Sequence, residues 1–342
     1  MNLPGPATTS AAVDRVKGWL FAPGSVPDWV VETSGSTGAP KRVRLSREAV
    51  RASVTATRER LGHDGGWALA LPPAYVAGLM VIARSLLAGT DPLIVSASPE
   101  VGVDRPSLDG RAISLVPTQL LRLLDSAGGP AWLRTGALVL LGGGPVPPGM
   151  RERAAAAGVR VVATYGASET CGGCVYDGLP LDGVEVSLES DGRVCLAGPM
   201  LFSGYDGDPE LTATTLVDGR FRTSDLGELD GGSRLRVLGR IDEVIVSGGV
   251  NVPGGAVAAR LREHPAVAEA EVVGAPDEEW GRRVVACVVP SASAPGLDEL
   301  RDWVGERLPR AWAPREVVVL EALPRLASGK VDRQALEAAW GR

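Results

Sequence analysis

A segment rich in glycine and hydroxyl side chains spans residues 33–41, with the order Thr-Ser-Gly-Ser-Thr-Gly-Ala-Pro-Lys. Glycine lets backbone N–H groups converge on an anion, and hydroxyl groups add further hydrogen-bond donors. The ammonium group of Lys41 adds a positive charge suited to a polyphosphate tail. The spacing differs from that of the Walker A loop, so the segment predicts a phosphate-binding loop of another kind. A flexible turn between strands is the alternative.

A second group of chemically useful side chains occupies residues 165–170. Tyr165 offers a ring that can stack on a purine, Ser168 a hydroxyl for a phosphate oxygen, and Glu169 a carboxylate for Mg²⁺. The segment is expected just past a strand at residues 159–163, and α/β proteins bind ligands at such strand ends. Taken alone, a tyrosine and a glutamate near a turn are more often packing and surface residues.

Three further polar positions lie toward the carboxyl end of the chain. Asp225 can accept hydrogen bonds from both hydroxyl groups of a ribose, and Arg240 is a candidate to join it. Lys330 follows Gly329 within residues 324–333. Singly, a surface ion pair and a solvated tail are the simpler explanations, so the meaning of these residues depends on the other motifs.

Short apolar runs recur along the first half of the chain and predict buried strands at residues 29–32, 68–71, 93–96, 112–116, 137–141 and 159–163. Helical stretches alternate with these strands. Ser46 and Gly62 are suited to begin and end one helix, and residues 150–157 predict another. This alternation predicts a largely parallel, layered α/β sheet with ligands at its strand ends.

The pattern changes after about residue 175, where short strands are predicted at residues 184–188, 193–197 and 221–229, joined by Asp-Gly turns. Past Arg240, the predicted elements are strands at residues 270–274 and 284–289 and helices at residues 256–263 and 298–308. We therefore expect an α/β fold with two domains. Residues 1–240 would form a large N-terminal domain with a β-rich subdomain, and residues 241–342 a small α+β domain.

Composition limits the classes of function. The length of 342 residues favours more than one domain, and the net charge of −6 argues against binding to nucleic acid or to an anionic membrane. No apolar run reaches the ~18 residues of a membrane span, and no signal-peptide pattern opens the chain, so a cytoplasmic location is expected. Cys171 and Cys174 have the spacing of a zinc-binding pair, but the sequence offers no second pair of ligands for zinc. Reduced thiols are therefore expected.

Taken together and in this order, these segments resemble the adenylate-forming superfamily of acyl-CoA synthetases, luciferases and peptide-synthetase adenylation domains. The resemblance covers the chain from about Thr33 to Arg333 and includes Gly-Arg-Ile-Asp-Glu-Val-Ile-Val-Ser-Gly-Gly-Val-Asn-Val-Pro at residues 239–253. It implies an enzyme that uses ATP and Mg²⁺ to convert a carboxylic acid to an acyl-adenylate and then to a coenzyme A thioester. It also implies that the small domain moves between the two half-reactions.

The resemblance assigns roles to particular positions. Lys330 corresponds to the catalytic lysine, Glu169 to the Mg²⁺ ligand and Asp242 to the hinge of the small domain. The loop of Ser247, Gly248 and Gly249 corresponds to the thiol channel. The implied ATP- and AMP-binding positions are Thr33, Ser34, Gly35, Ser36, Thr37, Gly38, Lys41, Gly142, Gly143, Gly144, Tyr165, Gly166, Ser168, Asp225 and Arg240.

Within the superfamily, residues 71–89 closely resemble the subgroup of short o-succinylbenzoate-CoA ligases of menaquinone biosynthesis. Only 32 residues precede Thr33, so a large domain trimmed at its N-terminus is expected. Tyr75 stands where the family often has histidine or another aromatic residue. Several neighbours in the family are dimers, which makes a homodimer one expectation. The candidate acyl-pocket residues are Tyr75, Val76, Gly78, Gly144, Gly166 and Cys171.

Other functions fit the same motifs. Another aryl- or acyl-CoA ligase would share them, as would an adenylation enzyme that loads a carrier protein, although no carrier-like domain follows the last residue. A non-catalytic nucleotide-binding homologue is the third alternative. It is disfavoured because the chain retains Lys41, Glu169, Asp225, Arg240 and Lys330 together.

Overall fold

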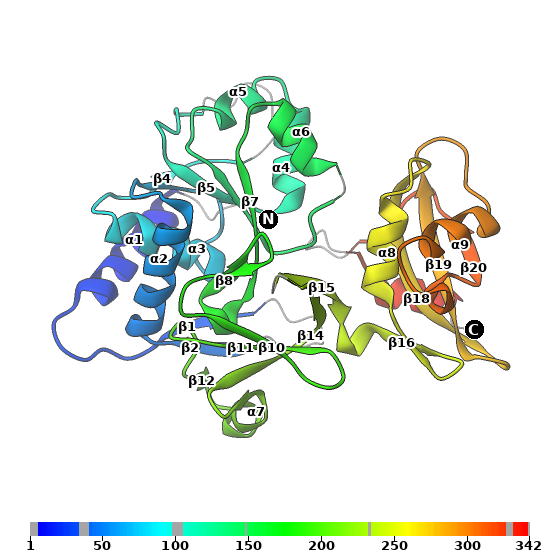
Figure 1. Ribbon diagram of the computed structural model, residues 1–342. Helices are drawn as coiled ribbons and strands as arrows, with labels where there is room; N and C mark the ends of the chain where they lie inside the picture. The colour runs from blue at the N-terminus through cyan, green and yellow to red at the C-terminus, as the bar shows by residue number, and fades with distance from the viewer. Residues whose placement is uncertain are drawn as a thin grey trace. The chain divides into compact units, whose positions relative to one another are not determined.

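The computed structural model describes residues 6–33, 41–97, 105–147, 149–231, 234–325 and 331–340. The chain divides into two compact units (Figure 1). The first unit contains residues 1–187, 195–223 and 231–235, and the second contains residues 188–194, 224–230 and 236–342. The domain boundary expected after residue 240 stays a prediction.

The first unit is built on a seven-stranded sheet of order β4-β3-β5-β6-β7-β8-β9. Its first five members pair in parallel: β4 (Leu93–Ile94), β3 (Trp67–Leu69), β5 (Ala112–Leu115), β6 (Val139–Leu141) and β7 (Val161–Ala167). The other two, β8 (Gly172–Tyr176) and β9 (Leu179–Pro180), add an antiparallel edge. Every residue of β3, β5 and β6 is buried, as expected for parallel strands covered on both faces. The predicted layered α/β class is confirmed.

Helices surround this sheet in two groups (Figure 1). The first group is α1 (Pro6–Phe21), α2 (Arg47–Leu61) and α3 (Val76–Leu87), and the second is α4 (Pro117–Asp125), α5 (Gly129–Leu133) and α6 (Met150–Ala156). Ile113 of β5 and Leu141 of β6 share one hydrophobic cluster with Leu120 of α4 and Trp132 of α5. The predicted caps of α2 are confirmed, because the Ser46 side chain accepts from the Ala49 N–H and Gly62 has φ of 59°.

A small antiparallel sheet carries the segment before the glycine-rich loop. Its order is β1-β2-β12, with β1 at Trp29–Glu32, β2 at Arg42–Leu45 and β12 at Gly204–Tyr205. The strand at residues 29–32 was expected to be buried like the others, which is wrong. Only Val31 of β1 is buried, because the strand lies at the edge of this sheet and buries side chains on one side only.

The β-rich region forms a five-stranded sheet of order β10-β11-β14-β13, with β15 paired to β14. Its strands are β10 (Glu185–Leu188), β11 (Arg193–Ala197), β13 (Leu216–Val217), β14 (Arg220–Leu229) and β15 (Leu235–Arg240), and α7 spans Pro209–Thr215. The division between the two units passes through these strands. Asp218 and Gly219 both have positive φ at the turn from β13 to β14, as a two-residue hairpin turn requires.

The rest of the second unit is an α+β arrangement. A hairpin of β16 (Val244–Ser247) and β17 (Val250–Pro253) is followed by α8 (Gly254–Arg262), β18 (Val267–Asp277), β19 (Gly281–Pro290), α9 (Leu297–Gly305), β20 (Glu316–Val319) and α10 (Arg333–Trp340). The order β18-β19-β20 combines one antiparallel and one parallel pairing. Val257 and Leu261 of α8 pack with Val272 of β18 in the core of this unit.

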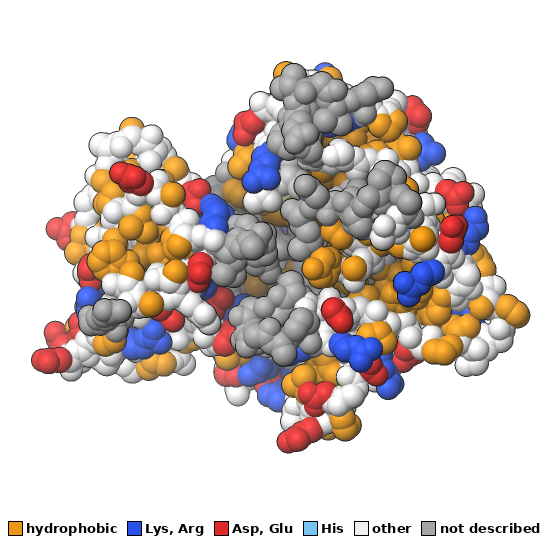
Figure 2. Space-filling view, turned by 180° about the vertical axis from the view of Figure 1, so that it is seen from behind, with side chains coloured by type: hydrophobic (Ala, Val, Ile, Leu, Met, Phe, Trp, Pro, Cys, Tyr) orange, Lys and Arg blue, Asp and Glu red, His pale blue; other side chains and the backbone are white. Residues whose placement is uncertain are grey.

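The described surface carries charges of both signs. On the face in Figure 2, acidic and basic side chains are interspersed among apolar ones. Because such a surface has little net field, an anion has to be held by groups arranged locally. Among the described residues, the helices are too short or too polar to cross a membrane.

Candidate active site

The carboxyl ends of the parallel strands bring three of the predicted segments to one edge of the sheet. Tyr75 lies in the segment after β3, residues 142–144 follow β6, and the short 3-10 helix η1 (Ser168–Thr170) follows β7. These strands run parallel in the order β3-β5-β6-β7, so the segments at their carboxyl ends lie at the same edge. Open α/β sheets bind their ligands at this edge.

The predicted phosphate loop joins β1 to β2 as the tip of a hairpin. The Thr33 N–H donates to the Lys41 carbonyl at 2.9 Å, and the Lys41 N–H donates to Thr33 Oγ1 at 3.1 Å. These two bonds close the base of the loop. Ser34, Gly35, Ser36, Thr37 and Gly38 lie outside the described residues, so their predicted contacts with phosphate stay predictions.

Tyr205 links the base of this hairpin to Glu169. Its hydroxyl donates to Glu169 Oε1 at 2.7 Å, and Lys41 Nζ lies 5.5 Å from the centre of its ring. Glu169 is only 7% exposed, and its backbone carbonyl accepts from the Phe202 N–H at 2.9 Å. A buried carboxylate, a tyrosine and a cation are thus connected next to the predicted phosphate loop. The sequence prediction paired Lys41 with Glu169 only through the family resemblance and did not include Tyr205.

The environment of Tyr205 keeps its hydroxyl a proton donor. Burial raises its pKa above the ordinary value, and the negative charge of Glu169 and the hydrogen bond to it raise the pKa further. Tyr205 therefore donates to one carboxylate oxygen of Glu169, and the carboxylate keeps further lone pairs that can bind another partner.

The donor set around Glu169 fits Mg²⁺ that arrives with a nucleotide. Among the described residues, no group of three or more His, Cys, Asp or Glu side chains could hold a metal ion. Mg²⁺ commonly takes only one or two carboxylates and completes its shell with phosphate oxygens and water. A single buried carboxylate beside the predicted phosphate loop meets that requirement, whereas a metal held by protein ligands alone would need more of them.

Tyr165 lies within a strand, which corrects the expectation that it follows one. Strand β7 continues to Ala167 because it pairs with β8, where Tyr165 stands opposite Val175. The register shifts between Tyr165 and Gly166, and a Cβ atom on Gly166 would lie 2.1 Å from the Gly172 carbonyl oxygen. Glycine is therefore required at 166 by the close approach of the two strands.

The glycine run after β6 is accounted for in part by its packing. A Cβ atom on Gly142 would lie 2.6 Å from Thr164 Oγ1, and Gly143 has φ of 78°. Gly143 and Gly144 are exposed at the carboxyl edge of the sheet. Backbone without side chains at this position leaves room for a flat ligand to approach.

The candidate acyl-pocket residues have different surroundings. Tyr75 and Val76 are half-buried at the start of α3. A Cβ atom on Gly78 would lie 2.2 Å from the Pro72 carbonyl oxygen, so helix packing requires glycine there. Burial raises the pKa of the Cys171 thiol to about 12, and nearby Cys174 adds to the rise, so this thiol stays protonated. A role of these residues in binding an acid stays a prediction.

In the second unit, Arg240 connects two of the predicted residues. Its Nε and Nη2 donate to the two carboxylate oxygens of Asp242 at 2.9 and 3.0 Å, and its Nη1 lies 3.8 Å from Asp225 Oδ1. The hydrogen bond to Asp242 is the main reason that the pKa of Arg240 is raised. The predicted hinge residue is thus paired with the predicted ribose-binding arginine, a contact that the sequence did not indicate.

The predicted thiol-channel loop is the two-residue turn between β16 and β17. Gly248 and Gly249 have φ of 57° and 79°, as a tight hairpin turn requires. The Gly248 N–H donates to the Trp280 carbonyl at 2.9 Å, and a Cβ atom on Gly248 would lie 2.5 Å from the Trp280 ring. Ser247 is buried, with no partner for its hydroxyl among the described residues.

Lys330 lies outside the described residues, but the residues on either side of it are held to β18. Arg325 and Val331 form an antiparallel bridge, and Arg325 donates to Glu269 at 2.6 Å. Arg333 forms an ion pair with Glu271 and donates to the Val272 carbonyl at 2.9 Å. Both ends of the segment that carries Lys330 are therefore anchored.

The fold and the site together define an adenylate-forming protein. Comparison with known families agrees. The family model described as AMP-binding enzyme matches residues 30–206, and the one described as AMP-binding enzyme C-terminal domain matches residues 256–330. The chain belongs to the AMP-binding enzyme family.

Individual relatives align with most of this chain. It is 45% identical to a probable 2-succinylbenzoate--CoA ligase of Mycobacterium tuberculosis, over 90% of this chain and 83% of that protein. Among solved structures, the o-succinylbenzoate CoA synthetase of Bacillus subtilis with the acyl-adenylate OSB-AMP is 31% identical, with a TM-score of 0.75 over 90% of this chain and 68% of that one. The amide bond synthetase McbA of Marinactinospora thermotolerans is 27% identical, with a TM-score of 0.80 over 91% of this chain and 68% of that one.

Proposed function

We propose that this chain is an AMP-forming acid–CoA ligase that activates 2-succinylbenzoate with ATP and transfers the acyl group to CoA. The names of the relatives from Mycobacterium tuberculosis and Bacillus cereus support the choice of acid, and so does the acyl-adenylate in the Bacillus subtilis structure. The observation that carries the proposal is the double contact of Tyr205. It joins Lys41, at the base of the phosphate hairpin, to the buried carboxylate of Glu169.

In the first half-reaction, a carboxylate oxygen of the acid attacks the α-phosphorus of ATP. The carboxylate oxygen forms a bond to that phosphorus. The bond between the α-phosphorus and the oxygen that bridges it to the β-phosphate breaks, and pyrophosphate leaves. Negative charge builds on the phosphoryl oxygens, so useful groups are cations and N–H donors already directed at them. Lys41, Lys330 and the backbone of residues 33–38 supply these groups. Glu169 would hold Mg²⁺, which neutralises phosphate charge when bound.

The remaining nucleotide contacts follow the family pattern. Tyr165 stacks on the adenine, with the backbone of residues 142–144 beside it, and Ser168 binds a phosphate oxygen. Asp225 accepts hydrogen bonds from the ribose hydroxyls, and Arg240 adds a donor. The half-buried ring of Tyr165 and the exposed glycines 143 and 144 support the adenine contacts.

In the second half-reaction, the CoA thiol attacks the carbonyl carbon of the acyl-adenylate. The thioester bond forms as the bond to the phosphate oxygen breaks, and AMP leaves. Residues 241–342 move as a domain about Asp242, which brings Ser247, Gly248 and Gly249 to the thiol channel in place of Lys330. The tight turn at these two glycines supports a role that needs close approach of backbone to a ligand.

Tyr75, Val76, Gly78, Gly144, Gly166 and Cys171 are the proposed contacts of the acid. Menaquinone biosynthesis is the pathway in which this acid is expected. A homodimer and a cytoplasmic location remain predictions from the sequence.

The test is a pyrophosphate-release assay with ATP and Mg²⁺, run with and without CoA across 2-succinylbenzoate, benzoate, short fatty acids and amino acids. We expect CoA-dependent turnover with 2-succinylbenzoate to exceed that with the other acids. A preference for a different acid would support the proposed reaction but contradict 2-succinylbenzoate as its substrate. Turnover that needs an amine in place of CoA would contradict CoA as the acceptor of the acyl group. No turnover with any acid would favour a non-catalytic homologue.

A further inference from the structure

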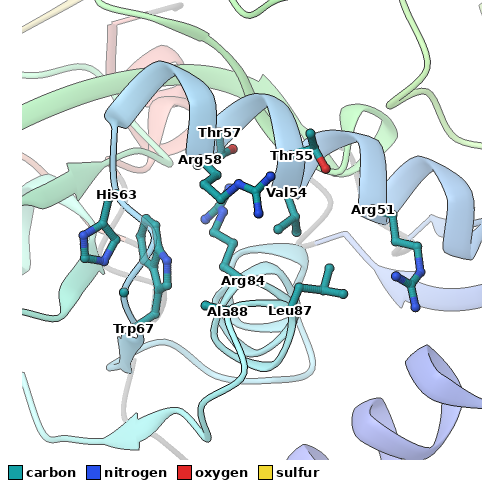
Figure 3. Close-up of a pocket in the computed structure, with 11 residues that line it drawn as sticks. Arg51, Val54, Thr55, Thr57, Arg58, His63, Trp67, Arg84, Leu87 and Ala88 are labelled. Atoms are coloured by element: carbon teal, nitrogen blue, oxygen red, sulfur yellow. The ribbon is translucent and has the colours of Figure 1, made fainter.

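A cavity of about 220 Å³ in the first unit lies between α2 and α3 (Figure 3), and none of its lining residues belongs to the candidate active site. Its walls come from α2, from the turn before β3 and from the last turns of α3. Trp67, at the amino end of β3, is part of the wall, whereas Tyr75 lies beyond the carboxyl end of the same strand. The cavity is therefore at the opposite edge of the parallel sheet from the predicted nucleotide-binding segments.

The cavity wall is basic. Its eleven residues include Arg51, Arg58, Arg84 and His63, and none of them is acidic. Arg58 of α2 and Arg84 of α3 extend toward one another, whereas Arg51 points away from both (Figure 3). The only acid paired with either arginine among the described residues is Asp64, 3.5 Å from Arg58 Nε. That pair is largely exposed to water and therefore holds Arg58 weakly.

Arg84 is the unusual member of this wall. It is 5% exposed, and its Nε is buried with no hydrogen-bond partner among the described residues. Its described ring contact is with Trp67, whose ring centre lies 5.0 Å from Arg84 Cζ, and its charge also acts on the buried thiol of Cys171. A buried cation is unfavourable unless a counter-charge and hydrogen-bond acceptors compensate it.

Another buried arginine of the same chain shows the usual compensation. Arg260, also 5% exposed, donates to Glu263 at 2.8 Å, to Glu306 at 2.9 Å and to the Trp303 carbonyl at 3.0 Å. Arg84 has the same burial and a ring below it, but no carboxylate or carbonyl among the described residues takes the place of these acceptors. The acceptors that Arg84 lacks are what an anion in the cavity would supply.

We propose that this cavity is a binding site for a small oxyanion, held between Arg58 and Arg84. Two guanidinium groups on different helices can present several N–H donors to the oxygens of one phosphate or carboxylate. Thr55 and His63 add polar groups to the wall. The volume of about 220 Å³ is below the range of about 300–1,000 Å³ typical of drug-sized ligands, so it suits a small anion rather than a nucleotide.

The test measures binding of inorganic phosphate to the full chain by calorimetry at low ionic strength, with and without saturating AMP. We expect saturable binding in both conditions, because AMP would occupy the nucleotide-binding edge and leave this cavity open. Arg58→Gln should weaken phosphate binding at least about tenfold, the loss expected for one charge-assisted contact. Arg122→Gln, at an exposed position of α4, removes the same charge and should leave the affinity unchanged.

A second variant tests the buried arginine. Arg84→Met should unfold at the same or a higher temperature than the parent chain in phosphate-free buffer, since it removes an uncompensated buried charge. It should also lose the rise in unfolding temperature that phosphate gives the parent chain.

Three results would overturn the proposal: no saturable phosphate binding in the millimolar range, binding that disappears with AMP, or equal affinity in the Arg58→Gln and Arg122→Gln variants. The comparison of these two variants does not require catalytic activity. It therefore stands even if the pyrophosphate-release assay disproves the proposed ligase reaction.

Discussion

Replacing Tyr205 with phenylalanine removes the hydroxyl that positions Glu169 and keeps the ring next to Lys41. The lost bond, 2.7 Å long, ends on the buried carboxylate of Glu169. A hydrogen bond to a charged group contributes about 1.5–3 kcal/mol of free energy to the folded protein. A buried carboxylate whose donor is removed loses that stabilisation. If Glu169 holds Mg²⁺, this free energy corresponds to a roughly 10- to 100-fold weaker response to the metal.

The assay is pyrophosphate release at saturating ATP and acid, measured over a range of free Mg²⁺ concentrations. We expect Tyr205→Phe to raise the Mg²⁺ concentration for half-maximal rate by about tenfold or more, with a smaller loss of rate at saturating Mg²⁺. The ring should still lie over Lys41, so the apparent affinity for ATP should change less than the affinity for Mg²⁺.

Tyr176→Phe is the matched control. Tyr176 is also buried, and its hydroxyl lies 3.0 Å from Thr57 Oγ1, in a hydrogen bond between neutral groups. Losing that bond should reduce the free energy of unfolding by about 1 kcal/mol and leave the Mg²⁺ response unchanged. If both variants show the same Mg²⁺ response as the parent chain, Tyr205 does not position the metal ligand and the reasoning fails.

Three more predictions concern other parts of the chain. Lys330→Ala should slow acyl-adenylate formation strongly and spare thioester formation from supplied acyl-adenylate; equal losses in both steps would contradict its role. Cys171 and Cys174 should not react with a thiol reagent in the folded protein at neutral pH. Because burial raises both pKa values from 9.0 to about 12, their contribution to stability should be intact below pH 9.0 and lost as the pH rises toward 12, as alkaline unfolding would show. Arg333→Met should lower the free energy of unfolding by roughly 2 kcal/mol in urea titrations, since it breaks the largely buried pair with Glu271.

The parts of the fold with strong local signals were predictable from the sequence. Ser46 and Gly62 cap α2 as expected, because capping depends on a side-chain oxygen and on a left-handed residue at fixed places. The mostly apolar runs of β5 and β6 became central parallel strands, because strands that are buried on both faces favour apolar residues at successive positions. The turn at Asp218 and Gly219 was equally readable.

Helices were missed for two different reasons. In α3, all residues from Gly78 to Leu86 are buried, so the helix has no polar face and no amphipathic period. In α1, Thr9, Val13, Val16 and Leu20 are buried at helical spacing, so here the sequence does carry a periodic signal.

The site shows the limit of reasoning from local pattern. The type and order of residues indicated what Lys41 and Glu169 are for, but their connection depends on Tyr205, which comes 36 residues after Glu169. Tyr205 reaches them because β12 pairs with β2, where Tyr205 stands opposite Val43. A two-residue strand has no periodicity to detect, so only the pairing of the folded chain identifies this residue.

The same limit applies to charge. An arginine in a helix is expected to extend its guanidinium group into water, and the sequence around Arg84 gives no reason to expect otherwise. Its burial without described acceptors arises because α2 covers the face of α3 that carries it, with Trp67 beneath. Uncompensated burial of a charge is unfavourable for folding, and a ligand that supplies the missing acceptors would offset that cost. Phosphate binding by the Arg58→Gln and Arg122→Gln variants therefore tests whether this charge serves a ligand or is only tolerated by the fold.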